Sequence, residues 1–362
     1  MRVIIAGGGT GGHIFPAVAI AHALQRLNPG TELLFVGANN RMEMEKVPQE
    51  GFNIIGLDIA GFNRSNMLKN LSLPFKIWKS HVKAKAIIKE FKPNAVIGVG
   101  GYASFPMLNA AQSMGIPTLI QEQNSYAGKS NKILGRKAKA ICVAYEHMEK
   151  FFPKEKLILT GNPVRKNISS SNITRTEGQA WLGMDPNRKT VLMVGGSLGA
   201  RSVNEALAAN LASLMDEDIQ FVWQTGKAYN ETAKREAVPY GNRIKVFEFI
   251  REMDNAYAAA DVVISRAGAL AIAEICIVAK PVVFVPLPHA AEDHQTSNAM
   301  ALVEHNAALM VKDNEAKTEL VKKIKALLHD ASMQEIMRTS LAKMAIKDAD
   351  ERIAKKIIEI AA

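Results

Sequence analysis

The stretch Gly7-Gly8-Gly9-Thr10-Gly11-Gly12-His13 decides how the chain begins to fold. It follows an apolar run at 3–6 and precedes an amphipathic run at 14–27, an order that predicts a strand, a tight turn and a helix. The glycines let a ligand approach the backbone closely, and the helix start offers free amides and a positive dipole end. The turn therefore predicts a site for an anion or an oxygen-rich ligand, with His13 as the candidate for proton transfer.

Two common phosphate-binding motifs share part of this glycine pattern. Gly7-x-Gly9-x-x-Gly12 matches the dinucleotide-binding fingerprint, which also needs an acidic residue at the end of the second strand. The expected second strand, 33–36, runs into Gly37 and Ala38 instead. A P-loop would end in Gly-Lys-Ser or Gly-Lys-Thr, whereas this loop ends in Gly-Gly-His. The sequence therefore argues against both an NAD-dependent oxidoreductase and a P-loop protein.

Positive charge is concentrated in the first half of the chain. The 362 residues include 45 Lys or Arg and 35 Asp or Glu, a net charge of +10. Residues 1–163 hold 20 basic and 10 acidic side chains, and the remainder holds 25 of each, so the whole excess lies before residue 164. A length of this size favours two domains.

The cysteines and the N-terminus indicate the compartment. Cys142 and Cys276 each lie inside an apolar run, which predicts buried thiols in a reducing environment rather than a disulfide or a metal site. We expect no signal peptide, because the first strand begins by residue 3, and no apolar stretch is long enough to span a bilayer. The expected protein is cytosolic, with attachment to a surface left open.

Short β-branched runs alternate with longer amphipathic runs, the pattern of parallel sheets covered by helices. We expect two doubly wound α/β domains, 1–163 and 164–347, divided near the sequence Thr-Gly-Asn-Pro-Val-Arg at 160–165. The expected strands are 3–6, 33–36, 54–57, 95–99, 118–121, 140–143 and 157–159 in the first domain, and 190–194, 220–223, 244–247, 262–265, 282–285 and 308–311 in the second.

Two further glycine-rich loops follow expected strands. They are Gly-Val-Gly-Gly-Tyr-Ala-Ser at 98–104 and Gly-Gly-Ser-Leu-Gly-Ala-Arg at 195–201, the latter opening the second half as 7–13 opens the first. A single glycine after a strand often only makes a turn. Because open α/β sheets bind ligands beyond the carboxyl ends of their strands, three such loops favour a ligand cleft between two facing domains.

The most basic segment of the chain runs from 64 to 92. Apolar residues at spacings of three and four predict a helical stripe that Pro74 interrupts. The stripe residues are Leu68, Leu71, Phe75, Trp78 and Val82, and the neighbouring lysines include Lys76, Lys79 and Lys83. Such a stripe either packs into the core or, if exposed, lies on an anionic membrane surface. Nucleic acid is disfavoured, because no recognition motif accompanies the charge.

In the second half, three polar features stand next to expected strands. Arg165 is a candidate phosphate ligand at the domain boundary, and Glu274 lies one turn into a helix, where its carboxylate can accept from two vicinal hydroxyls. A polar loop leads into a helix that begins with His294, Gln295 and Asn298. Taken singly, each of these residues is explained equally well as a surface residue or as a residue that stabilises a helix end. The Asp-x-Asp pairs at 216–218 and 348–350 lie where aspartate caps amides, so we assign no metal.

In combination these motifs resemble one family, the N-acetylglucosaminyltransferases that make lipid II for bacterial peptidoglycan. The resemblance covers nearly the whole chain. It implies two Rossmann-like domains facing across a cleft, the GT-B fold, with a C-terminal helix at 348–362 packing back on the first domain. The matching motifs are GGGTGGH at 7–13, GVGGYAS at 98–104, EQN at 122–124, GNPVR at 161–165, GGSLGAR at 195–201, RAGALAIAE at 266–274 and HQTSNA at 294–299.

The resemblance also implies roles for individual residues. Ile250 would meet the uracil of UDP-N-acetylglucosamine, Glu274 the ribose, and Ser197 with Arg165 the diphosphate. The residues expected to line the donor pocket are Ala269, Leu270, Gln295 and Asn298, and those expected to close over the sugar and the acceptor are Thr10, Gly11, Gly12 and Asn124. Ala271 stands where some members have threonine, which leaves one contact to the donor in doubt.

The resemblance further implies partners and a location. The partners are UDP-N-acetylglucosamine, lipid I, the anionic cytoplasmic face of the bacterial inner membrane, where the protein would be peripheral, and other cell-wall synthesis proteins. No cofactor and no nucleic acid are expected. Phe75, Trp78, Lys76, Lys79 and Lys83 are the candidate membrane residues.

Inverting sugar transfer needs a base for the attacking hydroxyl and stabilisation of the leaving diphosphate. His13 is the candidate base, acting on the C4 hydroxyl of N-acetylmuramic acid, since a helix N-terminus disfavours imidazolium. Three alternatives stay open: a UDP-N-acetylglucosamine 2-epimerase, a transferase with a soluble acceptor, and a non-catalytic binder of lipid or nucleotide sugar.

Overall fold

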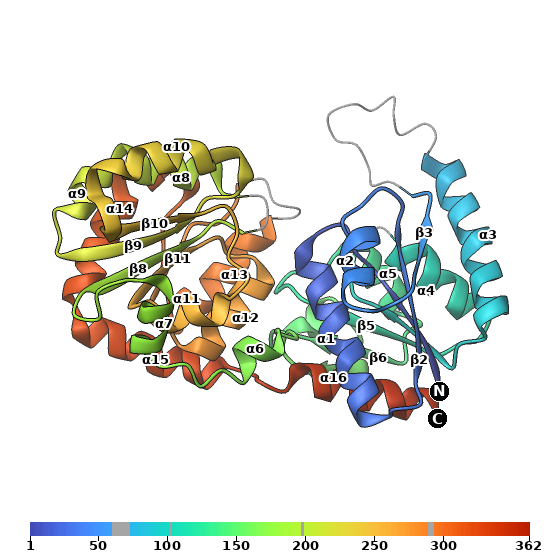
Figure 1. The fold of residues 1–362 in the computed structure, drawn as a ribbon. Helices are drawn as coiled ribbons and strands as arrows, with labels where there is room; N and C mark the ends of the chain where they lie inside the picture. The colour runs from blue at the N-terminus through green and yellow to red at the C-terminus, as the bar shows by residue number, and fades with distance from the viewer. Residues whose placement is uncertain (60–72, 102, 197–198, 289–292) are drawn as a thin grey trace. The chain divides into compact units, whose positions relative to one another are not determined.

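The computed structural model describes residues 1–59, 73–101, 103–196, 199–288 and 293–362, without the side chains of 73–75. The chain forms two compact units, residues 1–165 together with 348–362, and residues 166–347. Each unit has its own sheet, with helices on both faces (Figure 1). The first unit continues to Arg165, two residues beyond the end expected for the first domain.

The first unit contains a sheet of seven parallel strands in the order β3-β2-β1-β4-β5-β6-β7. Because β1 lies between β2 and β4, the strand order reverses there, and the loops after β1 and β4 meet at the carboxyl edge of the sheet. The strands are β1 (Arg2–Ala6), β2 (Glu32–Ala38), β3 (Ile54–Leu57), β4 (Ala95–Gly98), β5 (Thr118–Glu122), β6 (Ala140–Val143) and β7 (Leu157–Leu159).

Alternation along these strands divides the core of the first unit into two layers. Ile4 and Ala6 pack on one side of the sheet with residues of α3, α4 and α5, while Val3 and Ile5 pack on the other with α1, α2 and α16. The helices are α1 (Gly11–Leu27), α2 (Glu43–Gln49), α3 (Leu73–Phe91), α4 (Ser104–Ser113), α5 (Lys129–Gly135) and α16 (Ala349–Ala361), with short 3-10 helices at Met148–Lys150 and Lys154–Lys156.

The last helix, α16, packs against α1 although more than 300 residues separate them. Ile353 and Ile357 are fully buried in the layer that contains α1, and each contributes about 1.5–3 kcal/mol of apolar burial. Arg26 of α1 donates to Asp350 at 2.9 Å. The C-terminal helix is therefore part of the first unit.

The second unit repeats the topology with six parallel strands in the order β10-β9-β8-β11-β12-β13. The strands are β8 (Lys189–Val194), β9 (Ile219–Gln224), β10 (Ile244–Phe247), β11 (Val262–Ser265), β12 (Val282–Phe284) and β13 (Leu309–Met310). Every strand expected from the sequence is present in the two units, with ends within two residues. The expected fold of two doubly wound parallel sheets is confirmed.

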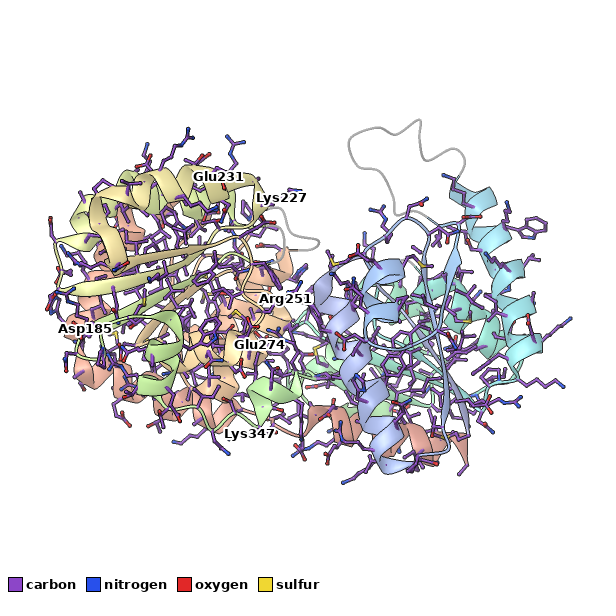
Figure 2. All side chains as sticks on the ribbon, in the orientation of Figure 1. Asp185, Lys227, Glu231, Arg251, Glu274 and Lys347 are labelled. Carbon is purple, nitrogen blue, oxygen red and sulfur yellow. The ribbon has the colours of Figure 1, made fainter. Side chains whose placement is uncertain are left out.

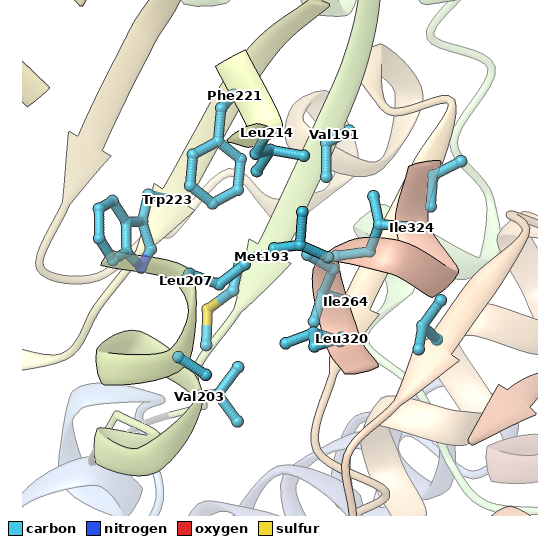
Figure 3. Packing of buried hydrophobic residues seen from close by; sticks show 14 of the residues in the cluster. Val191, Met193, Val203, Leu207, Leu214, Phe221, Trp223, Ile264, Leu320 and Ile324 are labelled. Atoms are coloured by element: carbon cyan, nitrogen blue, oxygen red, sulfur yellow. The ribbon is translucent and has the colours of Figure 1, made fainter. Parts of the chain in front are cut away.

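One layer of the second unit's core lies between this sheet and the helices α8, α9, α10 and α14 (Figure 3). Trp223 and Phe221 of β9 and Met193 of β8 are fully buried there. The helices are α6 (Lys166–Ser169), α7 (Arg175–Leu182), α8 (Arg201–Ala209), α9 (Leu211–Met215), α10 (Asn230–Ala237), α11 (Met253–Ala259), α12 (Ala269–Val278), α13 (His294–Val303), α14 (Ala316–His329) and α15 (Ala331–Met344), with 3-10 helices at Lys227–Tyr229, Val238–Arg243 and Asp313–Glu315.

Both cysteines are buried, as the sequence predicts. Cys142 lies in β6 and Cys276 in α12, and both are free thiols. Burial raises the pKa of each thiol to about 12, so neither forms a thiolate at neutral pH. They act as small apolar residues of the core.

Candidate active site

The glycine loop after β1 is held by three of its own amides. Gly7 N donates to Val36 O at 3.0 Å, Gly8 N to Gly100 O at 3.2 Å, and Gly9 N to the Glu43 carboxylate at 2.7 Å. Gly8 and Gly9 have positive φ angles of 141° and 90°, which explains the need for glycine at both positions. The loop is therefore tied to β2, to α2 and to the loop after β4.

His13 lies in the first turn of α1, and its ring contacts the second glycine loop. A Cβ on Gly100 would lie 2.6 Å from the ring's Cε1 and 2.7 Å from its Nδ1. The ring thus occupies space that only glycine at position 100 leaves open. The structure brings the candidate base to the place where the loops after β1 and β4 meet.

The start of α1 presents the amides that remain available to a ligand. His13 N and Ile14 N both donate to Thr10 O. Within the described part of the chain, the amides of Thr10, Gly11 and Gly12 have no acceptor. Thr10 is exposed and Gly12 half-buried, so a ligand can reach their N–H groups next to His13, whereas Gly11 between them is buried.

The loop after β5 is organised by Glu122, a buried carboxylate. One of its oxygens accepts from Asn124 N at 3.1 Å and from Asn124 Nδ2 at 3.4 Å. The other accepts from Gly128 N at 3.1 Å and from Asn131 Nδ2 at 2.8 Å. Asn124, a predicted site residue, is therefore positioned by its neighbour in the same motif.

Buried side-chain amides connect the loop after β5 to the loop after β4 and to the segment after β7. Gln123 Nε2 donates to Val99 O at 3.1 Å, in the loop after β4. Asn162 accepts from Gln121 at 2.9 Å and donates to Gln123 O at 3.0 Å. The motifs at 98–104, 122–124 and 161–165 are thus joined at one edge of the sheet, which their separation in the sequence did not reveal.

Arg165, the predicted phosphate ligand, belongs to the first unit. Its guanidinium carbon lies 5.6 Å from the centre of the Phe15 ring on α1. This cation–π contact places the half-buried side chain beside the helix that begins with the glycine loop. The domain boundary expected from the sequence assigns Arg165 to the second domain, whereas the first compact unit extends through it.

In the second unit, the loop after β8 packs closely on the end of β9. Gly195 N donates to Gln224 O at 3.1 Å, and a Cβ on Gly199 would overlap Thr225 O. Asn204 of α8 donates to Thr225 O at 2.9 Å and accepts from Trp223 at 3.0 Å. Ser197, predicted to meet the diphosphate, lies outside the described residues.

Glu274 lies on α12 and is 95% buried (Figure 2). The hydroxyl of Tyr257, from α11, donates to its Oε2 at 3.1 Å. Tyr257 is fully buried, so it fixes the carboxylate that we predicted to bind ribose. Ile250, the predicted uracil contact, is also buried and lies in the connection between β10 and α11.

The predicted residues of α13 bond to the loops beside it. Gln295 Oε1 accepts from Leu287 N at 2.9 Å, and Asn298, fully buried, donates to Ala267 O at 3.4 Å. Ala269 and Leu270 form the half-buried first turn of α12, directly after that loop. The structure therefore brings the start of α12 and the start of α13 together.

Arg266 ties three of these segments to one another. Its guanidinium donates to Val285 O at 3.0 Å, to Pro286 O at 3.1 Å and to Asp313 at 2.5 Å. It also donates to the hydroxyl of Ser202 on α8 at 2.8 Å. These bonds make Arg266 a structural residue at the loop edge of the second unit's sheet.

The helix α3 carries the predicted membrane residues and leaves several of them exposed. Ala84, Ile87 and Ile88 face the core, whereas Trp78 is 62% and Val82 49% exposed. Packing of the predicted stripe into the core is therefore wrong for Trp78 and Val82. Leu68, Leu71 and the side chain of Phe75 lie outside the described residues.

The lysines of α3 differ in their surroundings. Lys76 and Lys79 are exposed, but Lys83 donates to Gly56 O at 2.8 Å. A hydrogen bond from Asn39 lowers the pKa of Asp58, with further contributions from Lys83 and Lys79. Lys83 is thus partly engaged by β3 and its following loop.

Three residues that organise the site were missed by sequence reasoning. Glu43 follows β2 by five residues, Tyr257 lies in α11, and Arg266 directly follows β11. For Glu43 a signal was present: an acidic residue at the start of the helix after β2, slightly beyond the position that the dinucleotide fingerprint uses. Tyr257 and Arg266 have no local signal, because their partners are distant in sequence.

The described residues show neither a metal-binding cluster nor a helix that could span a membrane. Residues 1–59, 73–101, 103–196, 199–288 and 293–362 contain no group of three His, Cys, Asp or Glu side chains suited to a metal ion. Over the same ranges, every helix is too short or too polar to cross a membrane.

Comparisons with known proteins place this chain in a class. Residues 3–143 match the glycosyltransferase family 28 N-terminal domain, and residues 190–353 match the corresponding C-terminal domain. Together with two doubly wound sheets, these matches define a two-domain glycosyltransferase of the GT-B type.

Similar proteins narrow the class further. A UDP-N-acetylglucosamine–N-acetylmuramyl-(pentapeptide) pyrophosphoryl-undecaprenol N-acetylglucosamine transferase of Phocaeicola vulgatus is 52% identical, over 100% of this chain and 96% of the relative. The enzyme of the same name from Bacteroides thetaiotaomicron is 51% identical, over 100% and 98%. The crystal structure of Acinetobacter baumannii MurG matches with a TM-score of 0.79 and 31% identity, covering 99% of both chains. The chain belongs to glycosyltransferase family 28, in the MurG family.

Proposed function

We propose that this protein transfers N-acetylglucosamine from UDP-N-acetylglucosamine to the C4 hydroxyl of N-acetylmuramic acid in lipid I. The product is lipid II, the precursor of peptidoglycan, so the activity serves cell shape and cell division. The observation that carries the proposal is the position of His13 beside the amides of Thr10, Gly11 and Gly12, in a chain whose relatives bear this activity in their names. The epimerase and non-catalytic alternatives do not account for that family membership.

His13 serves as the general base. It removes the proton of the C4 hydroxyl as that oxygen attacks C1 of the donor sugar, and the bond between C1 and the UDP oxygen breaks with inversion. The position of His13 in the first turn of α1 disfavours the imidazolium form and keeps the ring able to accept a proton. Contact with Gly100 orients the ring. The acceptor's diphosphate lies against the amides of Thr10, Gly11 and Gly12.

The second unit holds the donor. Glu274, fixed by Tyr257, accepts hydrogen bonds from the ribose hydroxyls, and the backbone at Ile250 meets the uracil. Residues at the starts of α12 and α13, namely Ala269, Leu270, Gln295 and Asn298, line the donor pocket. Ser197 with its loop amides and Arg165 stabilise the diphosphate as UDP leaves. Asn124 and the loop 10–12 contact the sugar and the acceptor.

The first unit docks on the anionic cytoplasmic face of the inner membrane through α3. The polyprenyl tail of lipid I stays in the bilayer, so its head group must be taken at the surface. The exposed side chain of Trp78 supplies an apolar contact, and Lys76 and Lys79 supply positive charge. Phe75 is expected to join them, and Lys83 to contribute less because it bonds to Gly56. Other cell-wall synthesis proteins are further candidate partners.

The test is transfer of radiolabelled N-acetylglucosamine to a short-chain lipid I analogue by the wild type and by His13→Ala. Loss of a general base lowers kcat by about 100-fold to 10,000-fold. The Kd for UDP-N-acetylglucosamine, measured by titration calorimetry, should stay unchanged, since the donor residues of the second unit are intact. A variant that keeps wild-type kcat would remove His13 from the mechanism, and a wild type that binds the donor without transfer would refute the acceptor assignment.

A further inference from the structure

Glu43 is a buried carboxylate that joins the glycine loop after β1 to the end of β2. It is only 1% exposed. Its Oε2 accepts from Gly9 N at 2.7 Å and its Oε1 from Ala38 N at 2.9 Å. Each oxygen therefore accepts a backbone N–H, one from the glycine loop after β1 and the other from the last residue of β2. Charge-assisted bonds of this kind are roughly twice as strong as neutral ones.

Two glycines leave the space that this carboxylate fills. A Cβ on Gly8 would overlap Glu43 Cδ, and a Cβ on Gly37 would lie 2.5 Å from Glu43 Cγ. Gly8 needs glycine for its φ of 141° as well, but Gly37 lies in β2 with an ordinary strand conformation. The absence of a side chain at Gly37 is thus explained mainly by the presence of Glu43.

The same contacts decide which amides of the loop face outward. Gly7 N and Gly8 N are used by Val36 O and Gly100 O, and Glu43 uses Gly9 N. In the part of the chain that the structure describes, the N–H groups left for an anion are those of Thr10, Gly11 and Gly12. The bond from Gly8 to Gly100 also supports the backbone against which the His13 ring lies.

We propose that Glu43 is a positioning residue for the acceptor: by holding Gly9 N and the end of β2, it sets the amides of Thr10, Gly11 and Gly12 to receive the acceptor's diphosphate and keeps the His13 ring at the acceptor hydroxyl. This inference rests on the proposed function. Glu43 would touch neither substrate. It would determine where the first unit presents the acceptor-binding amides and the His13 ring.

The first test is Glu43→Gln in the full-length enzyme. Glutamine keeps the shape but turns an amide donor toward one of the two backbone N–H groups, so the loop must shift. We expect the KM for the short-chain lipid I analogue to rise about tenfold and kcat to fall about tenfold, the effect of losing one charge-assisted bond. The Kd for UDP-N-acetylglucosamine should not change.

Gly37→Ala provides a second variant outside the glycine loop. Its methyl group would meet Glu43 Cγ, and Ile54 Cδ1 at 3.1 Å, so it displaces the carboxylate without touching the loop itself. We expect the same rise in acceptor KM. In the Glu43→Ala background the methyl group finds room, so Gly37→Ala should add no further change in KM. Additive effects of the two substitutions would overturn the proposal.

Asp350→Asn is the matched control for folding. Asp350 is another buried carboxylate of the first unit, bonded to Arg26 on the face that α16 covers. The Asp350→Asn substitution should lower the Tm of the enzyme and leave its KM for the acceptor unchanged. If Glu43→Gln behaves like Asp350→Asn, Glu43 only stabilises the fold. An inactive wild type would instead refute the proposed function.

Discussion

The His13 ring occupies space that a side chain on Gly100 would need, since a Cβ there would lie 2.6 Å from the ring's Cε1. The same relation holds between Gly37 and Glu43, and between Gly101 and the backbone of Gly8, which a Cβ would overlap. At the scale of single residues, the geometry of the site therefore depends on glycines whose missing side chains leave room for a neighbouring side chain or backbone segment. This use of glycine is distinct from the positive φ that a turn requires.

Gly100→Ala should inactivate the enzyme by displacing His13. We expect kcat to fall at least about 100-fold, the lower range for a lost general base, while donor Kd stays unchanged. Gly51→Ala is the control, because Gly51 has a similar φ of +84° against +92° for Gly100, and a Cβ there would have nothing within 4 Å. Both variants lose a comparable amount of backbone stability, about 1 kcal/mol or more. Equal kcat in the two would show that the ring position is unimportant.

At the scale of elements, the helices α1 and α3 divide their residues between the core and a second role. The helix α1 buries Ile14, Ile20 and Leu24 while its first turn presents amides and His13. The helix α3 buries Ala84, Ile87 and Ile88 in its second half, and its first half exposes Trp78 beside Lys76 and Lys79. An exposed tryptophan with a basic fringe is typical of a surface helix that meets lipid head groups.

Trp78→Ser should weaken binding to vesicles that contain anionic lipid. We expect a loss of about tenfold in the partition coefficient, since burial of one aromatic side chain is worth about 1.5–3 kcal/mol and part of Trp78 is already covered. Cosedimentation with vesicles measures it. Trp181→Ser is the control, because Trp181 is 43% exposed but stacks on Phe247 in the second unit. Unchanged sedimentation of the Trp78 variant would refute docking through α3.

At the scale of the whole molecule, two units with separate cores share one chain. The first unit contains both ends of the sequence, because α16 packs against α1 and Arg26 bonds to Asp350. In the second unit Lys280, just beyond α12, donates to Ala258 O at 3.0 Å and to Ala260 O at 2.7 Å. Burial lowers its pKa from 10.5 to about 8.

The free energy of unfolding should therefore rise between pH 8 and pH 10.5, because the pKa of Lys280 is lower in the folded state than in the unfolded state. Below about pH 8 both states carry the proton, and between the two pKa values only the unfolded state does, so raising the pH favours the folded state. The gain is roughly 3 kcal/mol at most. Denaturant unfolding across this range should show the rise in the wild type and lose it in Lys280→Met. Parallel profiles would mean that Lys280 titrates normally.

Local patterns predicted the elements well for a physical reason. Each β-branched run, such as 190–194, carries its own strand signal, and each glycine loop marks the turn after it. The structure places His13 where the glycine loops after β1 and β4 meet, and it places Arg165 in the first unit, with its guanidinium carbon 5.6 Å from the centre of the Phe15 ring. The roles of all the candidate site residues stay predictions, to be tested by the variants above.

The sequence by itself determined the two parallel sheets, the glycine loops at their carboxyl edges and the family. Strand periodicity, turn-forming residues and family motifs can all be recognised from consecutive residues. Only the tertiary structure decided which side chains support those loops. Glu43 and Gly9 are 34 residues apart, and Arg266 and Asp313 are 47 apart. Such pairs meet because strand order brings distant loops to one edge of a sheet. A local sequence pattern therefore cannot predict which residues will contact each other there.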